Sequence, residues 1–113
     1  MASQVGNTIE KHPELGPFLN VFDYRPETLA FMESSGLQGG GPTWMALVTA
    51  ALEIESPATL AAISFDDEAD GVLITSASEP ALSVVQSYVS LLMTDEAFMR
   101  LCIEHARNRG YLE

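Results

Sequence analysis

The feature that most constrains the fold is a glycine-rich turn, Gly36 to Trp44, that leads directly into an amphipathic helix. Gly36 is placed to end one helix and Thr43 to begin the next, and consecutive glycines between them allow a tight reversal of the backbone. Apolar residues then recur with the spacing of one helical face, at Trp44, Leu47, Val48, Ala51 and Leu52. We therefore predict two helices joined by a tight turn, with Trp44 buried at the start of the second.

A glycine-rich loop before a helix can also bind phosphate through its backbone amides. No lysine follows these glycines, as a P-loop requires, and the spacing Gly36-x-x-Gly39-x-Gly41 reverses that of a dinucleotide-binding loop. The segment before the glycines has the pattern of a helix, whereas both kinds of phosphate loop follow a strand. The pattern therefore favours a plain helix-to-helix turn over a phosphate site.

Length and composition indicate one globular domain. The chain has 113 residues, of which 47% are hydrophobic, and its apolar runs fall well short of the roughly 20 residues that span a bilayer. The first residues lack the basic region and apolar stretch of a secretory signal, and the single Cys102 has no partner for an internal disulfide. We therefore expect a single domain over 1–113 in a reducing, cytoplasmic setting.

The charge balance is strongly acidic, with 16 acidic against five basic residues and a formal net charge of −11. Three of the basic residues lie near the C-terminus: Arg100, Arg107 and Arg109. Such a surface repels nucleic acids and anionic membranes, so we expect neither as a partner. It would attract a basic protein, although acidity can also serve solubility alone.

The first half of the chain predicts a hairpin followed by two helices. Strands are expected over 3–9 and 18–22, with a turn over 10–17 that contains two prolines. Pro26 fits the first turn of a helix, where its missing N–H costs nothing, and the helix would run to Gly36. The helix that carries Trp44 should end near Ser56-Pro57, because proline cannot continue it.

The second half repeats this order. Strands are expected over 60–65 and 72–75, joined by a loop that we call the acidic segment, Asp66–Gly71. Ser78 is a good N-cap for the next helix, Thr94 is expected to cap the last one, and Gly110 should end it.

The predicted order of elements is therefore ββααββαα, which hints at a duplicated ββαα unit. Strands with segregated helices predict an α+β fold, a four-stranded, mainly antiparallel sheet with helices packed on it. In such a fold, Trp44 should pack its helix on the sheet.

The acidic segment has part of the pattern of a calcium-binding loop. Four residues match the first half of an EF-hand loop: Asp66, Glu68, Asp70 and Gly71. The final position, which needs a bidentate glutamate, is Ala77, and the following residues predict a strand instead of a helix. We therefore predict no metal site there, and the segment is either a solvated turn or a surface that binds a partner.

Cys102 and His105 are three residues apart on one helix face and are the best candidates for other chemistry. A closed zinc site needs four ligands, and His12 is the only other histidine. A Cys–His nucleophile pair needs hydrogen-bond contact within a cleft, which two residues on one helix face make poorly. We therefore predict no catalytic residue, no metal and no cofactor, and a small enzyme that uses Cys102 and His105 is the weakest alternative.

Two motifs in order resemble those of a known family. The first is Gly36-x-x-Gly39-x-Gly41-x-x-Trp44 at the start of a helix, and the second is Phe65-Asp66-x-Glu68-Ala69 at a hairpin. Together they resemble the immunity protein 51 family of bacterial polymorphic toxin systems, over about residues 18–106. The chain departs from the usual family residues at Pro42-Thr43, Asp67 and Asp70.

The resemblance implies a non-enzymatic antitoxin. Such a protein binds a toxin made by the same cell and blocks it, so that the cell does not poison itself. The motif residues would then be mainly structural: Gly36, Gly39, Gly41, Trp44 and Phe65. A small acidic adaptor or a homodimeric regulator is the alternative from another class.

The candidate contact residues come from charge and exposure. Four carboxylates lie within five residues on a predicted turn that should project into solvent: Asp66, Asp67, Glu68 and Asp70. No basic residue is close to them in sequence, so a basic surface on a toxin would relieve their mutual repulsion. Gln38 in the glycine turn is a second candidate.

Overall fold

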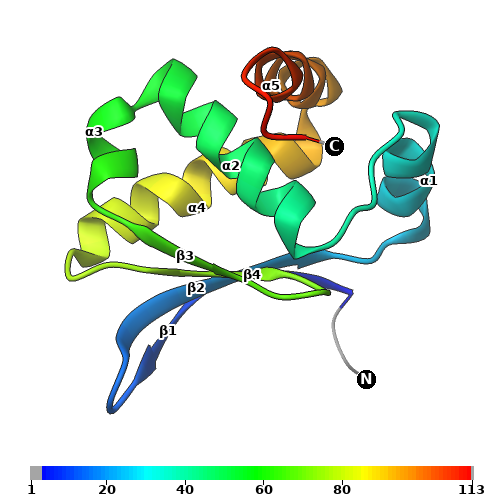
Figure 1. Cartoon of the computed structure of the whole chain (residues 1–113). Helices are drawn as coiled ribbons and strands as arrows, with labels where there is room; N and C mark the ends of the chain where they lie inside the picture. Colours follow the sequence, from blue (N-terminus) through cyan, green and yellow to red (C-terminus); the bar gives the residue numbers. More distant parts are fainter. Residues whose placement is uncertain (1–3, 113) are drawn as a thin grey trace.

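The computed structural model describes residues 4–112 and shows a four-stranded antiparallel sheet with its helices gathered on one face (Figure 1). The elements are β1 (Val5–His12), β2 (Gly16–Asp23), α1 (Pro26–Ser34), α2 (Gly41–Glu55), α3 (Pro57–Ala61), β3 (Ser64–Asp67), β4 (Val72–Thr75), α4 (Glu79–Thr94) and α5 (Glu96–Asn108). The predicted α+β class is confirmed, and the ββααββαα order differs only by the additional short helix α3.

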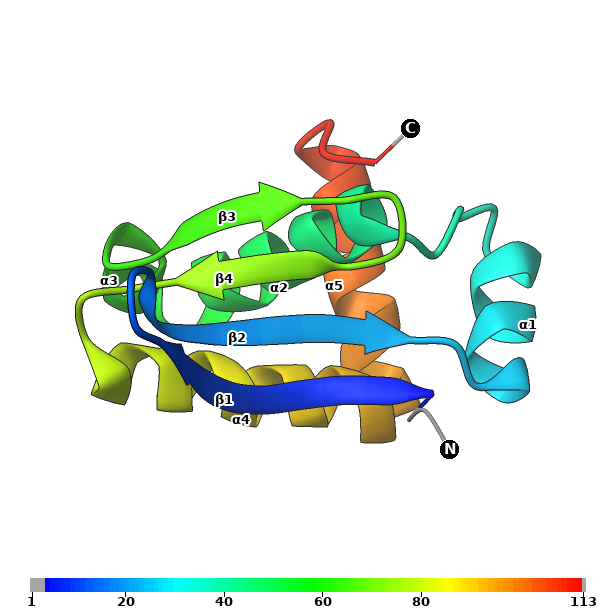
Figure 2. The same ribbon diagram turned by 90° about the horizontal axis from the view of Figure 1, so that it is seen from below.

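The sheet consists of two hairpins joined edge to edge. β1 pairs with β2, β3 pairs with β4, and the antiparallel pairing of β2 with β4 gives the order β1-β2-β4-β3 (Figure 2). The central strands bury one row of side chains under α2 and α4: Leu19, Val21, Val72 and Ile74. The two hairpins match the hint of a duplicated unit, but α2 of the first half and α4 of the second cover the sheet, so the helices are not equivalent.

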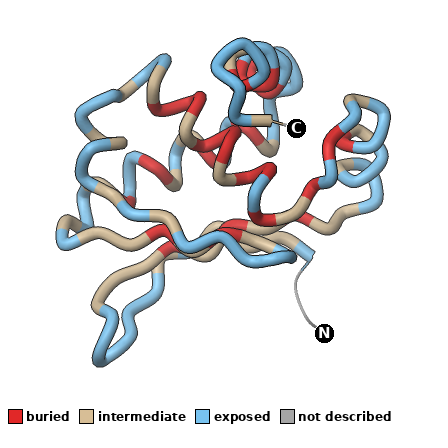
Figure 3. Tube along the Cα trace, viewed as in Figure 1, coloured by how far each residue is buried: buried red, intermediate tan, exposed pale blue. Residues whose placement is uncertain are grey.

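The core lies between the sheet and the helices, and its centre is α2 (Figure 3). Trp44 is fully buried with the rest of the predicted apolar face, so the burial expected for it is confirmed. α5 packs on α2 and α4 as a further layer, away from the sheet. None of the helices in the described range 4–112 has the length and apolar character of a membrane span.

Glycines end two helices as predicted. Gly36 and Gly110 adopt positive φ values of 76° and 77°, which glycine tolerates without steric cost. The amide of Leu37 donates to the carbonyl of Met32, and that of Tyr111 donates to Ala106, which satisfies backbone groups that the helix ends leave free.

Two predicted helix starts are wrong. α2 begins at Gly41, two residues before Thr43, whose hydroxyl instead accepts a hydrogen bond from the amide of Gly39 (3.1 Å). α5 is capped by Asp95, whose carboxylate accepts from the amide of Phe98 (3.1 Å), while Thr94 ends α4. A carboxylate at the positive end of a helix is the stronger cap, and Thr94 already has a helical partner.

The predicted strand boundaries also need correction. The first strand was expected over 3–9, where residue 3 lies outside the described residues, but β1 continues to His12 because its pairing with β2 reaches Gly16. The strand predicted over 60–65 is β3, Ser64–Asp67, preceded by α3. Pro57 begins a new helical turn, and a short apolar run does not distinguish a buried helix from a strand.

Candidate partner-binding surface

The structure brings the two motif stretches into direct contact. The amide of Gly41, the first residue of α2, donates to the carbonyl of Ala69 in the acidic segment (3.3 Å). A Cβ atom at Gly40 would lie 2.2 Å from the carbonyl oxygen of Ala69, and one at Gly41 would lie 1.9 Å from that of Glu68. Both positions therefore require glycine because of close backbone approach, and the need for glycine at Gly40, which the motif leaves unspecified, was missed by sequence reasoning.

This contact holds the acidic segment against the start of α2. The first amides of a helix lack partners inside the helix and form its positive end, so they favour the carbonyl oxygens of a neighbouring loop. Trp44 is buried one turn further along, and Phe65 on β3 is half-buried against the same core. Gly41, Trp44 and Phe65 thus contact the backbone and the core of the protein itself.

The carboxylates of the acidic segment are exposed, but two of them are not in a loop. Asp66 and Asp67 belong to β3, where they pair with Leu73 and Val72 of β4. Side chains alternate along a strand, so Asp67 lies on the side of buried Val72, and Asp66 lies on the opposite side. Glu68 and Asp70 lie in the connection, which is closed by a hydrogen bond from the amide of Glu68 to the carbonyl of Gly71 (2.8 Å).

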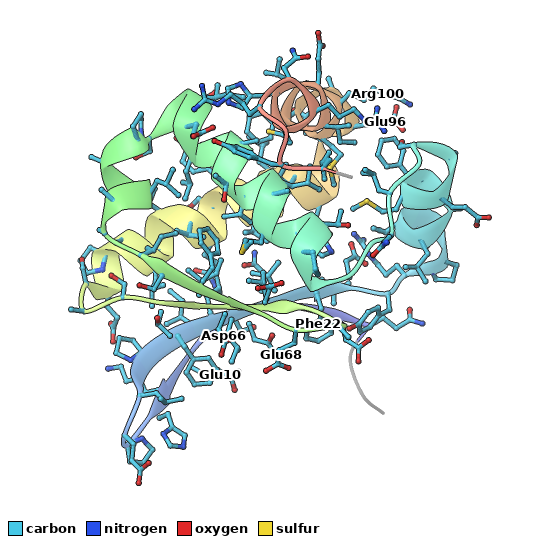
Figure 4. The ribbon with its side chains drawn as sticks, in the orientation of Figure 1. Glu10, Phe22, Asp66, Glu68, Glu96 and Arg100 are labelled. Atoms are coloured by element: carbon cyan, nitrogen blue, oxygen red, sulfur yellow. The ribbon has the colours of Figure 1, made fainter. Side chains whose placement is uncertain are left out.

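Asp66 faces a side of the sheet that no helix of the described chain covers (Figure 2). We call this side the open sheet face. Its half-buried members on the central strands are Phe18, Asn20, Phe22, Leu73 and Thr75. Figure 4 shows Glu10, Phe22, Asp66 and Glu68 together on this side, away from the helices. The end of the acidic segment and the open sheet face are thus one continuous surface.

An aromatic pair lies on the open sheet face. The rings of Phe22 and Tyr24 stack with centroids 5.3 Å apart, and the Tyr24 hydroxyl donates to the backbone carbonyl of Asp70. The Phe22 ring lies over Gly6 of β1, where a Cβ would come within 2.1 Å of a ring carbon. The Phe22 ring is thus in contact with β1, and the hydrogen bond of the Tyr24 hydroxyl links the pair to the acidic segment.

Carboxylates lie at both margins of the open sheet face. Glu10 lies on β1, across the sheet from Asp66 on β3, and both side chains are exposed. Lys11 lies on the other side of β1, where its amine is 2.9 Å from the carboxylate of Glu79 on α4. Within residues 4–112, no lysine or arginine forms an ion pair with Glu10, Asp66 or Glu68.

Gln38 lies on a different flank of the glycine turn. It is exposed and lines a small cavity of about 130 Å³ together with Pro42, Tyr111 and Leu112. Gly40 and Gly41 touch the acidic segment, whereas the side of the turn that Gln38 lines belongs to the C-terminal end of the chain. The structure therefore places the acidic segment against one side of the glycine turn, whereas Gln38 lies on another side, beside the C-terminal end of the chain.

A groove between α1 and α5 is the rival surface, because it gathers basic residues on an acidic molecule. Arg100 lies over the Phe31 ring (5.0 Å) and 3.6 Å from Glu96, and Arg107 donates to the carbonyl of Ser35. Arg25 donates to the buried carboxylate of Asp23 (2.7 Å). These basic groups already have partners inside the protein, which leaves them poorly placed to bind an acidic ligand.

Cys102 and His105 lie on the same helix in different surroundings. Cys102 is fully buried, and burial raises the pKa of its thiol to about 12, so the thiol stays protonated at neutral pH. The Nε2 atom of His105 is 3.0 Å from the carboxylate of Glu53 on α2. No group of three or more His, Cys, Asp or Glu side chains within the described residues is arranged to hold a metal.

Two polar clusters were missed by sequence reasoning. Asp23 is buried, which alone would raise its pKa, but hydrogen bonds from Arg25 and Thr28 outweigh burial and lower the pKa below its usual value. Glu53 accepts from the Tyr111 hydroxyl (2.7 Å) and pairs with His105, which lower its pKa. An aspartate two residues before Arg25-Pro26 was a usable signal for the first cluster, whereas the second depends on long-range contacts.

Comparison with known proteins gives one result. The family model described as Immunity protein 51 matches residues 8–108, which is most of the chain and includes both motif stretches. Neither the curated proteins nor the solved structures yield a match.

Proposed function

The chain belongs to the immunity protein 51 family, and on that premise we propose that it binds and neutralises a protein toxin produced by the same bacterial cell. The family match over residues 8–108 is the observation that carries this proposal. The protein acts by occupying a surface that the toxin needs, in the cytoplasm of the cell that makes both proteins. It performs no chemistry of its own, and its buried Cys102 thiol suits a structural role.

The charge of the chain supports a basic toxin as the partner. With a formal net charge of −11, the protein attracts a basic surface over several ångströms, and such attraction speeds encounter and rejects acidic competitors. The contact residues are drawn from the acidic segment, Asp66, Asp67, Glu68 and Asp70, with Gln38 as a second contact. The glycine turn supports them by holding the segment in place.

Co-expression tests this proposal directly. The chain is expressed with the toxin domain encoded beside its own gene, and growth and co-purification are measured. We expect the chain to restore growth and to elute with the toxin as a stable complex. A toxin that kills equally well with and without the chain, and that does not co-purify with it, would leave the adaptor or the homodimeric regulator as the better explanation.

A further inference from the structure

We propose that the toxin docks on the open sheet face, and that the docking surface of the toxin consists of an exposed apolar group surrounded by lysine or arginine side chains. This inference rests on the proposed function and makes it more specific. It narrows the contact within the acidic segment to Asp66 and Glu68, the two members on the open sheet face, and excludes Asp67.

The first argument is that this face is apolar without being covered. β2 and β4 are the central strands, and on the helix side their side chains are completely buried, as Leu19 and Ile74 are. On the other side Phe18, Phe22 and Leu73 remain half-buried, beside the polar side chains of Asn20 and Thr75. Half-buried apolar side chains on a sheet face with no covering layer are typical of a protein interface.

The second argument is that the aromatic pair on this face already packs against the protein's own chain. The Phe22 ring occupies the space over Gly6 that a side chain would fill and stacks on Tyr24, whose hydroxyl donates to the backbone carbonyl of Asp70. Aromatic side chains that are ordered before binding lose little conformational entropy when a partner covers them. A surface that only needed to be soluble would not require this order.

The third argument is charge, and it identifies the occupant. Glu10 on one margin and Asp66 and Glu68 on the other are exposed, and no basic side chain of the described chain neutralises them. A second copy of this chain packed face to face would bring these carboxylates together, and like charges at an interface are costly. A toxin surface with basic groups around an apolar group would pair with the carboxylates at the margins of the open sheet face and pack against the apolar side chains between them.

The neighbouring residues Asp66 and Asp67 provide a matched pair for the test. They have the same charge and lie next to each other on β3, but they point to opposite sides of the sheet. Asp66→Lys and Asp67→Lys therefore change the net charge of the chain equally. At about 0.5 M salt, where charges more than a few ångströms apart are screened, only a direct contact should distinguish them.

Binding of the toxin domain recovered by co-expression, in a catalytically inactivated form, is measured by calorimetry at that salt concentration. Leu73→Ala tests the half-buried apolar side chains of the face, and Leu101→Ala is its control, because Leu101 is an exposed leucine on the helix α5. We expect Asp66→Lys and Leu73→Ala each to raise Kd about tenfold or more, and both controls to change it less than about threefold. Circular dichroism and thermal unfolding confirm that each variant is folded.

Three results would overturn the inference. If Asp66→Lys and Asp67→Lys weakened toxin binding equally and Leu73→Ala left Kd unchanged, the contact would lie on the acidic segment alone. Full binding by all four variants would place it elsewhere while leaving the proposed function intact. If the chain associated with itself, and Asp66→Lys strengthened that self-association, the open sheet face would be a contact between two copies of this chain. Failure of the unmodified chain to bind any toxin is a separate outcome, which removes the proposed function itself.

Discussion

At the scale of single residues, the two motifs act through space and packing. Gly40 and Gly41 leave room for the carbonyl oxygens of Ala69 and Glu68, and Trp44 fills the core behind them. Gly40 and Gly41 need not touch a toxin in order to matter, because they help to determine where the acidic segment lies.

Replacing Trp44 should destabilise the protein by an amount that depends on the replacement. Trp44→Ala removes a fully buried side chain and should cost about 3–5 kcal/mol of unfolding free energy. Trp44→Phe should cost much less, because the indole N–H is buried and has no hydrogen-bond partner within residues 4–112. Urea unfolding measures both, with half-exposed Leu101→Ala as the control. An unchanged midpoint in Trp44→Ala would mean that the side chain is on the surface.

Gly41→Ala tests the contact between the two motifs. The new Cβ would lie 1.9 Å from the carbonyl oxygen of Glu68, so the hairpin connection must move, and we expect a loss of about 1–3 kcal/mol. Gly16→Asn is the control, because Gly16 has a positive φ but nothing within 4 Å, and asparagine tolerates that conformation. Thermal unfolding that gave equal stability for the two variants would show that the contact is loose.

At the scale of elements, the helices are fastened by polar clusters at their ends. Asp23, Arg25 and Thr28 join the end of β2 to the start of α1. Glu53 joins α2 to the C-terminal end of the chain through His105 and Tyr111. Both clusters add polar contacts between separate elements to the packing of the apolar core.

The Glu53 cluster should produce a pH dependence of defined sign. Hydrogen bonds from Tyr111 and His105 lower the pKa of Glu53 from its ordinary value of 4.5, so the charged form stabilises the folded protein. This contribution is complete above pH 4.5 and disappears as the pH falls through the lowered pKa. Glu53→Gln should therefore be less stable than the unmodified chain at pH 7, and the difference should shrink below about pH 4.5.

Urea unfolding at several pH values from 7 to 3 measures this difference. Glu55→Gln is the matched control, since Glu55 is an exposed carboxylate two residues away on the same helix. A stability difference between Glu53→Gln and the unmodified chain that stayed constant down to pH 3 would contradict the assignment.

At the scale of the whole molecule, the two faces of the sheet have different surroundings. One face carries the core and the helices (Figure 3), while the other carries the aromatic Phe22 and the carboxylates of Glu10, Asp66 and Glu68 (Figure 4). An excess of acidic over basic residues gives the molecule a net charge of −11, which acts at longer range than any single contact.

Long-range attraction predicts a salt-dependent association rate with the toxin. For the unmodified chain, the rate constant should fall by about tenfold between low and high salt, because screening removes electrostatic steering. Asp67→Asn combined with Asp70→Asn should reduce this salt dependence with little change in the dissociation rate, because charges outside the contact act mainly on encounter. Stopped-flow mixing measures both rates. If the association rate constant of the unmodified chain did not depend on salt, the acidic surface would serve solubility and not encounter with the toxin.

Much of this fold is predictable from local sequence. Pro26 begins α1, Gly36 and Gly110 end helices, Ser78 caps α4 through the amide of Ala81, and the apolar stripe on α2 is buried. These features depend on dihedral angles, capping groups and periodicity within a few residues, which the sequence alone determines.

Tertiary structure decided the rest. How far β3 extends and which side of the sheet Asp66 faces both depend on the pairing of β3 with β4. A shift of one residue in that pairing would exchange Asp66 and Asp67 between the two sides of the sheet, because side chains alternate with a period of two. The surface proposed to bind the toxin therefore exists only once segments far apart in the chain have paired.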